Sequence, residues 1–238
     1  SMAKAVVRTR PTAIAALMVE RGEADAMLCG LVGQYPSKLR HIRDIIGMDA
    51  GVSEPSAMAA VATEKGTFFY LDTHVQDDPS PEQIAEAVLQ VSIRLKLFGI
   101  TPKIALLSAA NFGSRDTCGA IKMRKALELI RARAPRLEVE GEMQADAALM
   151  PDLRERMFPN SQLHGKANVF VFPNQDAANI AYNMTRMLSD GVAIGPILMG
   201  IAKPAHILMP QSTVRRIVNM SAVACVEAQI RAEMRQER

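Results

Sequence analysis

Short apolar runs alternate along this chain with longer segments of helical periodicity. The runs show no polar–apolar alternation, so each predicts a strand that is buried on both faces. Strands of this kind, separated by amphipathic helices, are typical of parallel sheets covered by helices. The pattern therefore predicts an α/β fold with mostly parallel sheets and flanking helices. The predicted strands are residues 26–29, 68–71, 104–107, 139–142, 169–172, 194–199 and 205–209.

The segments between these strands carry helix signals. Ser80 followed by Pro81 is a strong start signal, because serine caps a helix and proline suits its first turn. Ser37 predicts a similar cap for the helix that follows it. The predicted helices are residues 3–22, 37–46, 81–98, 116–134, 176–188 and 213 to the end.

Composition limits the class of protein. Hydrophobic residues make up 49% of the 238 residues and charged residues 22%, which is too apolar for a disordered chain. The net charge of +3 is smaller than nucleic-acid binders of this size usually carry, so we expect no nucleic-acid partner. Three widely spaced cysteines indicate a reducing, cytoplasmic compartment. The longest uncharged apolar stretch, 191–202, is shorter than the ~20 residues that span a membrane, so we expect no membrane partner.

The loop 108–114 is the strongest local candidate for a binding site. It follows a buried strand and precedes a helix, so it lies at the carboxyl edge of the sheet, where ligands bind. Gly113 permits close backbone approach, and free amides at the helix start suit an anion. The alternative is an ordinary strand–helix turn. The candidate residues here are Ser108, Asn111, Gly113 and Ser114.

Two arginine pairs are further candidates for holding an anion. Arg215 and Arg216 fall in the first turn of the last helix, where the helix dipole disfavours cations unless an anion is near. Arg40 and Arg43 lie three residues apart on one helix and could hold phosphate. The alternative for both pairs is solvent exposure.

Several familiar catalytic patterns are missing from the sequence. The four histidines show no paired-ligand spacing, so we expect no metal site. No P-loop, GxSxG or GxGxxG motif is present, so dinucleotide binding has no support in these residues.

Four segments together resemble the phosphate acetyl/butyryl transferase family. They stand in family order and cover most of the chain. Further segments resemble, more narrowly, the transacetylase-like C-terminal region of bacterial hybrid NADP-dependent malic enzymes. The first set is GEAD (22–25), EGEMQADAAL (140–149), GKANVFVFPN (165–174) and GPILMGIAKP (195–204); the second is VRTR (7–10), 22–33, IIGMDAGV (45–52) and SAM (56–58).

The resemblance implies a phosphotransacetylase-like architecture of two lobes with a cleft between them. The first lobe would combine residues 1–50 with 201–238 and lack its opening part, and residues 51–200 would form the middle lobe. Family members bind coenzyme A and acyl phosphate in the cleft and form homodimers through the middle lobe. Within a malic enzyme, larger homo-oligomers are expected.

The sequence departs from active family members at the reacting groups. Where those members carry a Ser-Arg pair, this chain has Met209 and Pro210. Where they carry the proposed base, an Asp, this chain has Arg216, which cannot accept a thiol proton. The Asn-Asp that precedes the shared leucine becomes His206-Ile207. By contrast, Arg40 and Lys203 match residues of the family.

The resemblance therefore implies a domain without catalytic residues of its own. We expect a regulatory and oligomerising role in a malic enzyme, with acetyl-CoA as effector. NADP and a divalent metal would belong to the malic enzyme unit outside this chain. Two alternatives are an active phosphate acetyltransferase and a ligand-free assembly module. The expected effector-binding residues are Arg40, Ser108, Asn111, Gly113, Ser114, Lys203, Arg215 and Arg216.

Overall fold

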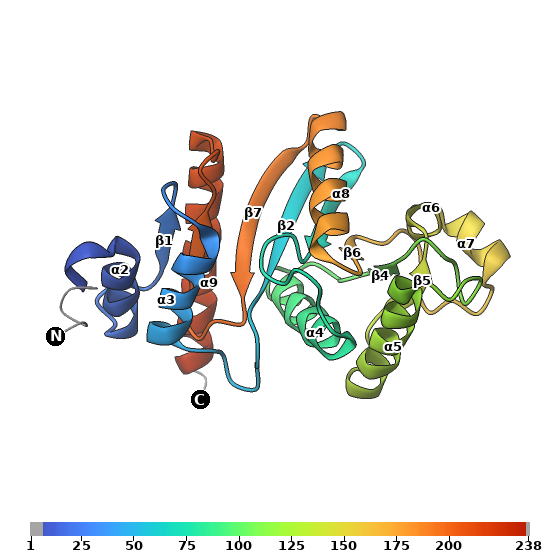
Figure 1. Cartoon of the computed structure of the whole chain (residues 1–238), viewed down its shortest axis with the longest axis horizontal. Helices are drawn as coiled ribbons and strands as arrows, with labels where there is room; N and C mark the ends of the chain where they lie inside the picture. Colours follow the sequence, from blue (N-terminus) through green and yellow to red (C-terminus); the bar gives the residue numbers. More distant parts are fainter. Residues whose placement is uncertain (1–6, 237–238) are drawn as a thin grey trace. The chain divides into compact units, whose positions relative to one another are not determined.

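The computed structural model describes residues 7–236 and divides the chain into two compact units. Unit 1 comprises Ser1–Pro55 and Ile194–Arg238, and unit 2 comprises Ser56–Ala193. The chain therefore enters unit 2 once and leaves it once, so unit 1 is built from both ends of the sequence (Figure 1).

Unit 1 is built around two parallel strands. β1 (Met27–Gly30) pairs with β8 (Ala205–Leu208), with Cys29 opposite Ile207. The helices of this unit are α2 (Pro11–Glu20), α3 (Tyr35–Ile46) and α9 (Val214–Gln236). α9 packs against both strands, and α2 packs against α3. The core is apolar and includes Ala13, Ala16, Val19, Ile42, Ile207 and Met220.

Unit 2 contains a mixed sheet covered on both faces. The sheet order is β5-β4-β6-β3-β2-β7, and β7 (Val192–Met199) begins in this unit and continues past its end. Neighbours from β5 to β3 run parallel, whereas β2 is antiparallel to β3. The other strands are β2 (Ser56–Thr63), β3 (Gly66–Leu71), β4 (Ile104–Leu107), β5 (Val139–Met143) and β6 (Val169–Val171).

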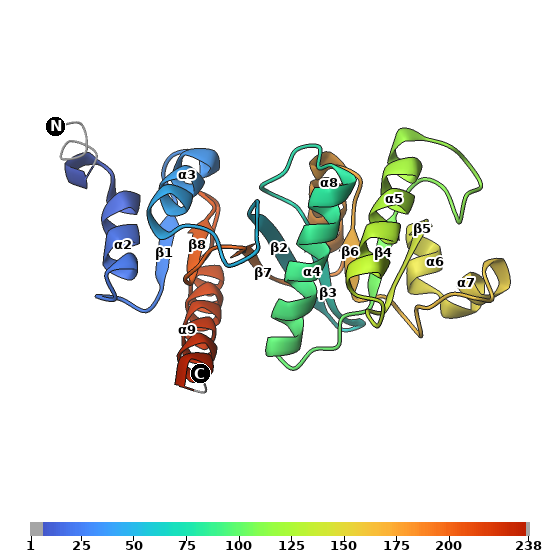
Figure 2. The same cartoon turned by 90° about the horizontal axis from the view of Figure 1, so that it is seen from below.

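Helices lie on both faces of this sheet. α4 (Pro81–Leu97) and α5 (Cys118–Arg133) cover one face, and α6 (Ala145–Leu149) and α8 (Gln175–Leu188) cover the other (Figure 2). The short helix α7 (Pro151–Met157) follows α6. On the α8 side, aromatic rings pack in the core: Tyr70 stacks on Phe172 and meets Phe170 and Tyr182 edge to face.

The expected α/β class with mostly parallel sheets is confirmed, and so is the start of α4. The Ser80 hydroxyl accepts the Gln83 amide hydrogen, and the Gln83 side chain accepts the amide hydrogen of Ser80. Thr117 and Asn174 also cap α5 and α8, each through its side chain alone, which accepts one backbone amide hydrogen.

Three local predictions were wrong. The helix expected over 3–22 is interrupted at Arg10, because a residue before proline favours extended backbone, and residues 3–6 lie outside the described part. α3 begins at Tyr35, so Ser37 lies inside the helix and does not cap it. β2 was not predicted as a strand, because its alanine-rich sequence SAMAAVAT has weak strand propensity.

Among the described residues, no helix is both long and apolar enough to cross a membrane.

Candidate functional site

The loop 108–114 of unit 2 lies at the carboxyl end of β4, as expected, and its polar groups are bonded to one another and to β5. Asn111 donates from Nδ2 to Gln144 Oε1 at 3.0 Å, and its Oδ1 accepts the Gln144 amide hydrogen at 2.7 Å. Ser114 Oγ accepts the Asn111 amide hydrogen at 3.0 Å. The amide of Ser108 donates to the Met143 carbonyl oxygen at 2.9 Å. The loop is therefore held on the end of β5 by its own polar side chains.

A buried carboxylate binds the amide of Gly113, the residue at which we expected close backbone approach by a ligand. Gly113 donates its amide hydrogen to Glu142 Oε1 at 2.8 Å, and Arg124 donates to the same oxygen at 3.0 Å. The Glu142 side chain is buried, and its Oε2 has no hydrogen-bond partner among the described residues. An anion that approached Gly113 in this arrangement would meet a negative charge already in place.

In unit 1, the two arginines at the start of α9 occupy different environments. Arg215 is exposed, whereas Arg216 is only 8% exposed and lies on the buried face of the helix. The Arg216 amide donates to Thr213 Oγ1 at 3.3 Å, so Thr213 caps the helix. The alternative that both head groups are solvent-exposed is therefore wrong for Arg216.

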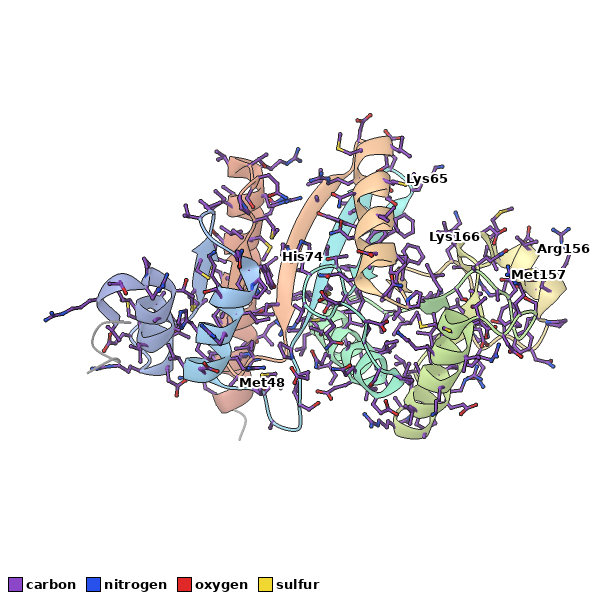
Figure 3. All side chains as sticks on the ribbon, in the orientation of Figure 1. Met48, Lys65, His74, Arg156, Met157 and Lys166 are labelled. Carbon is purple, nitrogen blue, oxygen red and sulfur yellow. The ribbon has the colours of Figure 1, made fainter. Side chains whose placement is uncertain are left out.

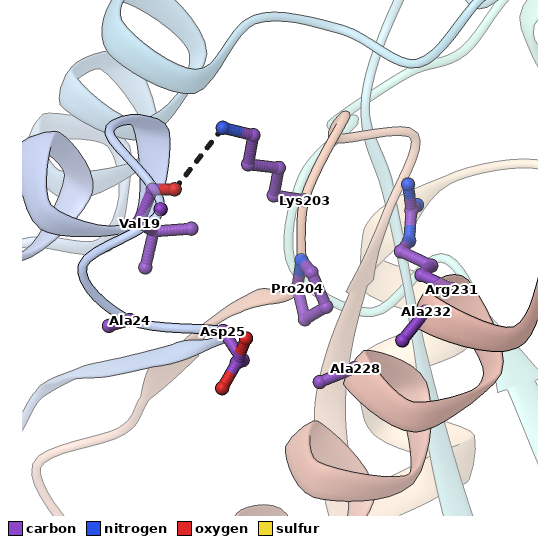
Figure 4. Close-up of a pocket in the computed structure, with 9 residues that line it drawn as sticks. Val19, Ala24, Asp25, Lys203, Pro204, Ala228, Arg231 and Ala232 are labelled. Carbon is purple, nitrogen blue, oxygen red and sulfur yellow. Dashed lines mark hydrogen bonds between the residues drawn. The ribbon is translucent and has the colours of Figure 1, made fainter. Parts of the chain in front are cut away.

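The two other cations expected in unit 1 also differ. Arg40 is exposed on α3, and its neighbour Arg43 lies 3.8 Å from a carboxylate oxygen of Glu54. Lys203 donates to the backbone carbonyl oxygen of Val19 at 3.2 Å (Figure 4). It also donates to the carbonyl oxygen of Glu20 at 2.5 Å and lies 3.0 Å from the Glu20 carboxylate. Lys203 therefore neutralises the carboxyl end of α2, where the helix dipole favours a cation.

Lys203 also borders a small cavity of unit 1. Its volume is about 80 Å³, well below the ~300–1,000 Å³ of typical ligand sites. Its charged lining side chains are Asp25, Lys203 and Arg231, and Arg231 already pairs with Asp49 at 2.8 Å. The cavity has room for a few water molecules and not for a nucleotide.

A buried polar pair that the sequence analysis missed lies between β8 and α9. His206 is fully buried, and its Nε2 lies 3.4 Å from Oε2 of Glu227, which is 3% exposed. The helical spacing of Arg216, Met220, Ala224 and Glu227 on one buried face could have indicated that Glu227 points inward.

The sequence Asp72-Thr73-His74 forms a turn at the end of β3 (His74 is labelled in Figure 3). The Asp72 carboxylate accepts amide hydrogens from His74, Val75 and Ala57 at 2.9–3.2 Å. Burial nevertheless raises the pKa of Asp72 to about 7. Because the Asp72 carboxylate accepts these backbone amides, it stabilises the turn that ends β3.

The sequence profile described as phosphate acetyl/butaryl transferase matches residues 1–225. The chain therefore belongs to the phosphate acetyl/butaryl transferase family. A solved phosphotransacetylase from Streptococcus pyogenes superposes with a TM-score of 0.88 at 30% identity, covering 96% of this chain and 70% of that one.

The malic enzymes among its relatives are more similar in sequence. The chain is 50% identical over 222 residues to the NADP-dependent malic enzyme of Escherichia coli (strain K12), covering 93% of the chain. It is 49% identical over 226 residues to the NAD-dependent malic enzyme of Rhizobium meliloti (strain 1021), covering 95% of the chain. The chain spans 29% of the length of each of these two relatives. The expected similarity to the transacetylase-like region of malic enzymes is confirmed.

Proposed function

We propose that this chain is the regulatory and assembly domain of a malic enzyme, and that it binds acetyl-CoA as an effector without transferring the acetyl group. Malate oxidation, with its nicotinamide cofactor and divalent metal, would belong to the rest of that enzyme. The two malic enzyme relatives differ in the cofactor that their names give, so we extend the proposal to NAD as well as NADP. A cytoplasmic location is part of the proposal.

The observation that carries the proposal is Arg216. By the resemblance, active transacetylases have their proposed base at this position, and a guanidinium cannot accept the thiol proton of coenzyme A. Arg216 is also mostly buried in the first turn of α9, the end of a helix that attracts anions. Together with the exposed Arg215 beside it, Arg216 makes this helix start positively charged, which suits a phosphate or carboxylate of an acyl-CoA.

The eight expected binding residues differ in whether their polar groups are accessible to a ligand or already bonded to other residues. Arg40 and Arg215 are exposed and available to an anion, and Arg216 lies at a helix start. Lys203 is engaged by Glu20 and by backbone carbonyl oxygens, and the amide of Gly113 is engaged by Glu142. The Asn111 side chain and the Ser114 hydroxyl are likewise engaged within the loop 108–114, and the Ser108 amide donates to Met143. We therefore rest anion binding on Arg40, Arg215 and Arg216 of unit 1.

Calorimetric titration with acetyl-CoA and, separately, with free coenzyme A tests the proposal. We expect acetyl-CoA to bind, and Arg40→Ala and Arg215→Ala each to weaken binding about tenfold, because each loses a charge-assisted contact. Arg21→Ala, an exposed arginine of the same unit paired with Glu23, is the control and should bind normally. No binding of either ligand at millimolar concentration would leave a ligand-free assembly module.

A second assay addresses the enzyme alternative. Folded protein supplied with acetyl phosphate and coenzyme A should form no acetyl-CoA above background. Turnover would establish an active phosphate acetyltransferase instead. In the malic enzyme that contains this domain, acetyl-CoA should change malate kinetics, and malate binding should change acetyl-CoA affinity by the same factor, since coupling between binding sites is reciprocal.

Assembly is the second part of the proposal, and α8 supplies its surface. Four large apolar side chains lie on the exposed face of this helix at the spacing of one stripe. Apolar patches of this kind on a folded protein mark interaction sites. We assign the homodimer contact of unit 2 to this stripe, which consists of Ile180, Met184, Met187 and Leu188, exposed by 59, 56, 68 and 79%.

A further inference from the structure

The buried His206 links three elements of the fold through its two ring nitrogens. Nδ1 accepts the amide hydrogen of Leu198 on β7 at 3.2 Å, so the ring hydrogen lies on Nε2. Nε2 lies 3.4 Å from Glu227 Oε2 on α9, a close polar contact that is not a hydrogen bond, and Nε2 has no hydrogen-bond partner among the described residues. A single imidazole on β8 therefore connects the backbone of one strand to a side chain of the last helix.

Burying two such groups is unfavourable unless they meet each other. An isolated polar group in an apolar core costs free energy, and an apolar pair of the same volume is often as stable or more so. What a buried polar pair supplies is a unique alignment, because sliding or rotating the helix would separate the partners. The 3.4 Å contact thus specifies one position of α9 along β8.

Glu227 and Arg216 lie on the same face of α9. Together with Met220 and Ala224 they form the row of buried side chains that faces β1 and β8. Glu227 lies eleven positions after Arg216, which corresponds to about 16 Å along a helix. A helix fixed at Glu227 therefore also fixes where the Arg216 side chain enters the core.

We propose that His206 and Glu227 are positioning residues that seat α9 on β8 and thereby hold Arg216 at the helix start. The link to ligand binding rests on the proposed function, in which Arg216 binds the effector. It accounts for two departures from active transacetylases at once. By the resemblance, those members carry Asn at position 206 and Asp at position 216, and both positions are altered here.

The first test measures the His206 tautomer and hydrogen exchange in α9 without any ligand. Nitrogen NMR of the full chain should show His206 with its hydrogen on Nε2, and the Nε–H signal of Arg216 should be protected from exchange with water. In His206→Asn and Glu227→Leu, exchange of the α9 amides and of Arg216 Nε–H should quicken about tenfold. Glu227→Gln should restore protection, because its side chain has the same length and keeps an oxygen opposite Nε2.

An exposed histidine–glutamate pair is the matched control. His164 Nδ1 lies 3.2 Å from Glu138 Oε1, but the His164 side chain is 82% exposed. His164→Asn and Glu138→Gln should leave α9 protection unchanged. For positions 206 and 227, the double variant should lose no more protection than the worse single variant, since both break the same contact. Additive losses, or a ring hydrogen on Nδ1, would overturn the pairing.

The second test links the pair to binding. Glu227→Leu should weaken acetyl-CoA binding about tenfold in the unaltered chain and not at all in an Arg216→Ala background. Normal affinity in Glu227→Leu despite lost α9 protection would overturn the positioning role while leaving the proposed function intact. Absence of acetyl-CoA binding by the unaltered chain would instead overturn the proposed function, and the exchange experiment would still decide whether the pair seats α9.

Discussion

The amide of Gly113 and the carboxylate of Glu142 are joined by a 2.8 Å hydrogen bond that fixes the middle of the loop 108–114. Gly113 needs its glycine for this contact, because its φ of +84° is one that L side chains rarely adopt. Arg124 donates to the same carboxylate oxygen, so the loop, β5 and α5 meet at one negative charge.

Removing this charge should loosen the loop. Glu142→Ala leaves the Gly113 amide and the Arg124 guanidinium without their shared acceptor, and we expect a loss of about 2 kcal/mol in stability. Hydrogen exchange of the loop amides and chemical unfolding of the chain measure the two effects. Glu142→Gln, which keeps an acceptor oxygen, should protect Gly113 better than Glu142→Ala does. Equal exchange in both variants would contradict a role for the hydrogen bond.

Arg154 is a buried cation that binds backbone. It donates to the carbonyl oxygens of Ala147, Leu163 and Gly165 at 2.7–3.0 Å and so joins α6, α7 and the segment before β6. Burial lowers the pKa of Arg154, although an arginine remains charged at neutral pH. Because three buried acceptors lose their donor, Arg154→Ala should destabilise the chain by about 3 kcal/mol.

Thermal and urea unfolding measure this loss, and Arg156→Ala provides the control. Arg156 lies on the same short helix and is exposed, so its removal should change stability by less than about 0.5 kcal/mol. If both variants unfolded alike, the three carbonyl contacts would not be stabilising the fold.

The elements of this fold were largely predictable because their signals are local. The capping box at Ser80 and Gln83 and the apolar runs of β4 and β6 stand in the sequence itself. β2 was not predicted because alanine favours a strand only where neighbouring strands bury it. The neighbours that bury β2 are β3 and β7, which lie elsewhere in the sequence. The helix break at Arg10 also has a local signal, since Pro11 follows it.

The candidate site was less predictable because its contacts are long-range. The sequence places Gly113 in a loop after a strand, but the carboxylate that bonds it lies 29 residues further on. Likewise, nothing near Lys203 in the sequence indicates that its ammonium group binds the last carbonyl oxygens of α2, more than 180 residues earlier. Whether a polar group is free for a ligand depends on such partners, and spacing alone does not reveal them.

The apolar stripe of α8 should carry the homodimer contact. Met184→Glu places a charge in the stripe, and we expect the variant to sediment as a monomer at concentrations where the unaltered chain is a dimer. Ile93→Glu is the control, because Ile93 is 61% exposed on α4, which covers the other face of the sheet. A dimer that persists in Met184→Glu would move the contact away from α8.

Asp72 should make the stability of unit 2 depend on pH near neutrality. Its pKa is raised from 3.8 to about 7 by burial, so the folded state favours the protonated carboxyl. This contribution is fully present below about pH 4 and is lost as pH rises through about 7, and it amounts to at most about 4 kcal/mol.

Asp72→Asn cannot ionise, so the free energy of unfolding of this variant, measured from pH 5 to 8, should lack this part of the pH dependence. At pH 5 the variant should be less stable than the unaltered chain, because its amide group cannot accept the Ala57 amide hydrogen as the second carboxyl oxygen does. This deficit should shrink as pH rises, since only Asp72 then becomes a buried charge. Parallel pH profiles for the two proteins would show that Asp72 titrates alike in the folded and unfolded chain.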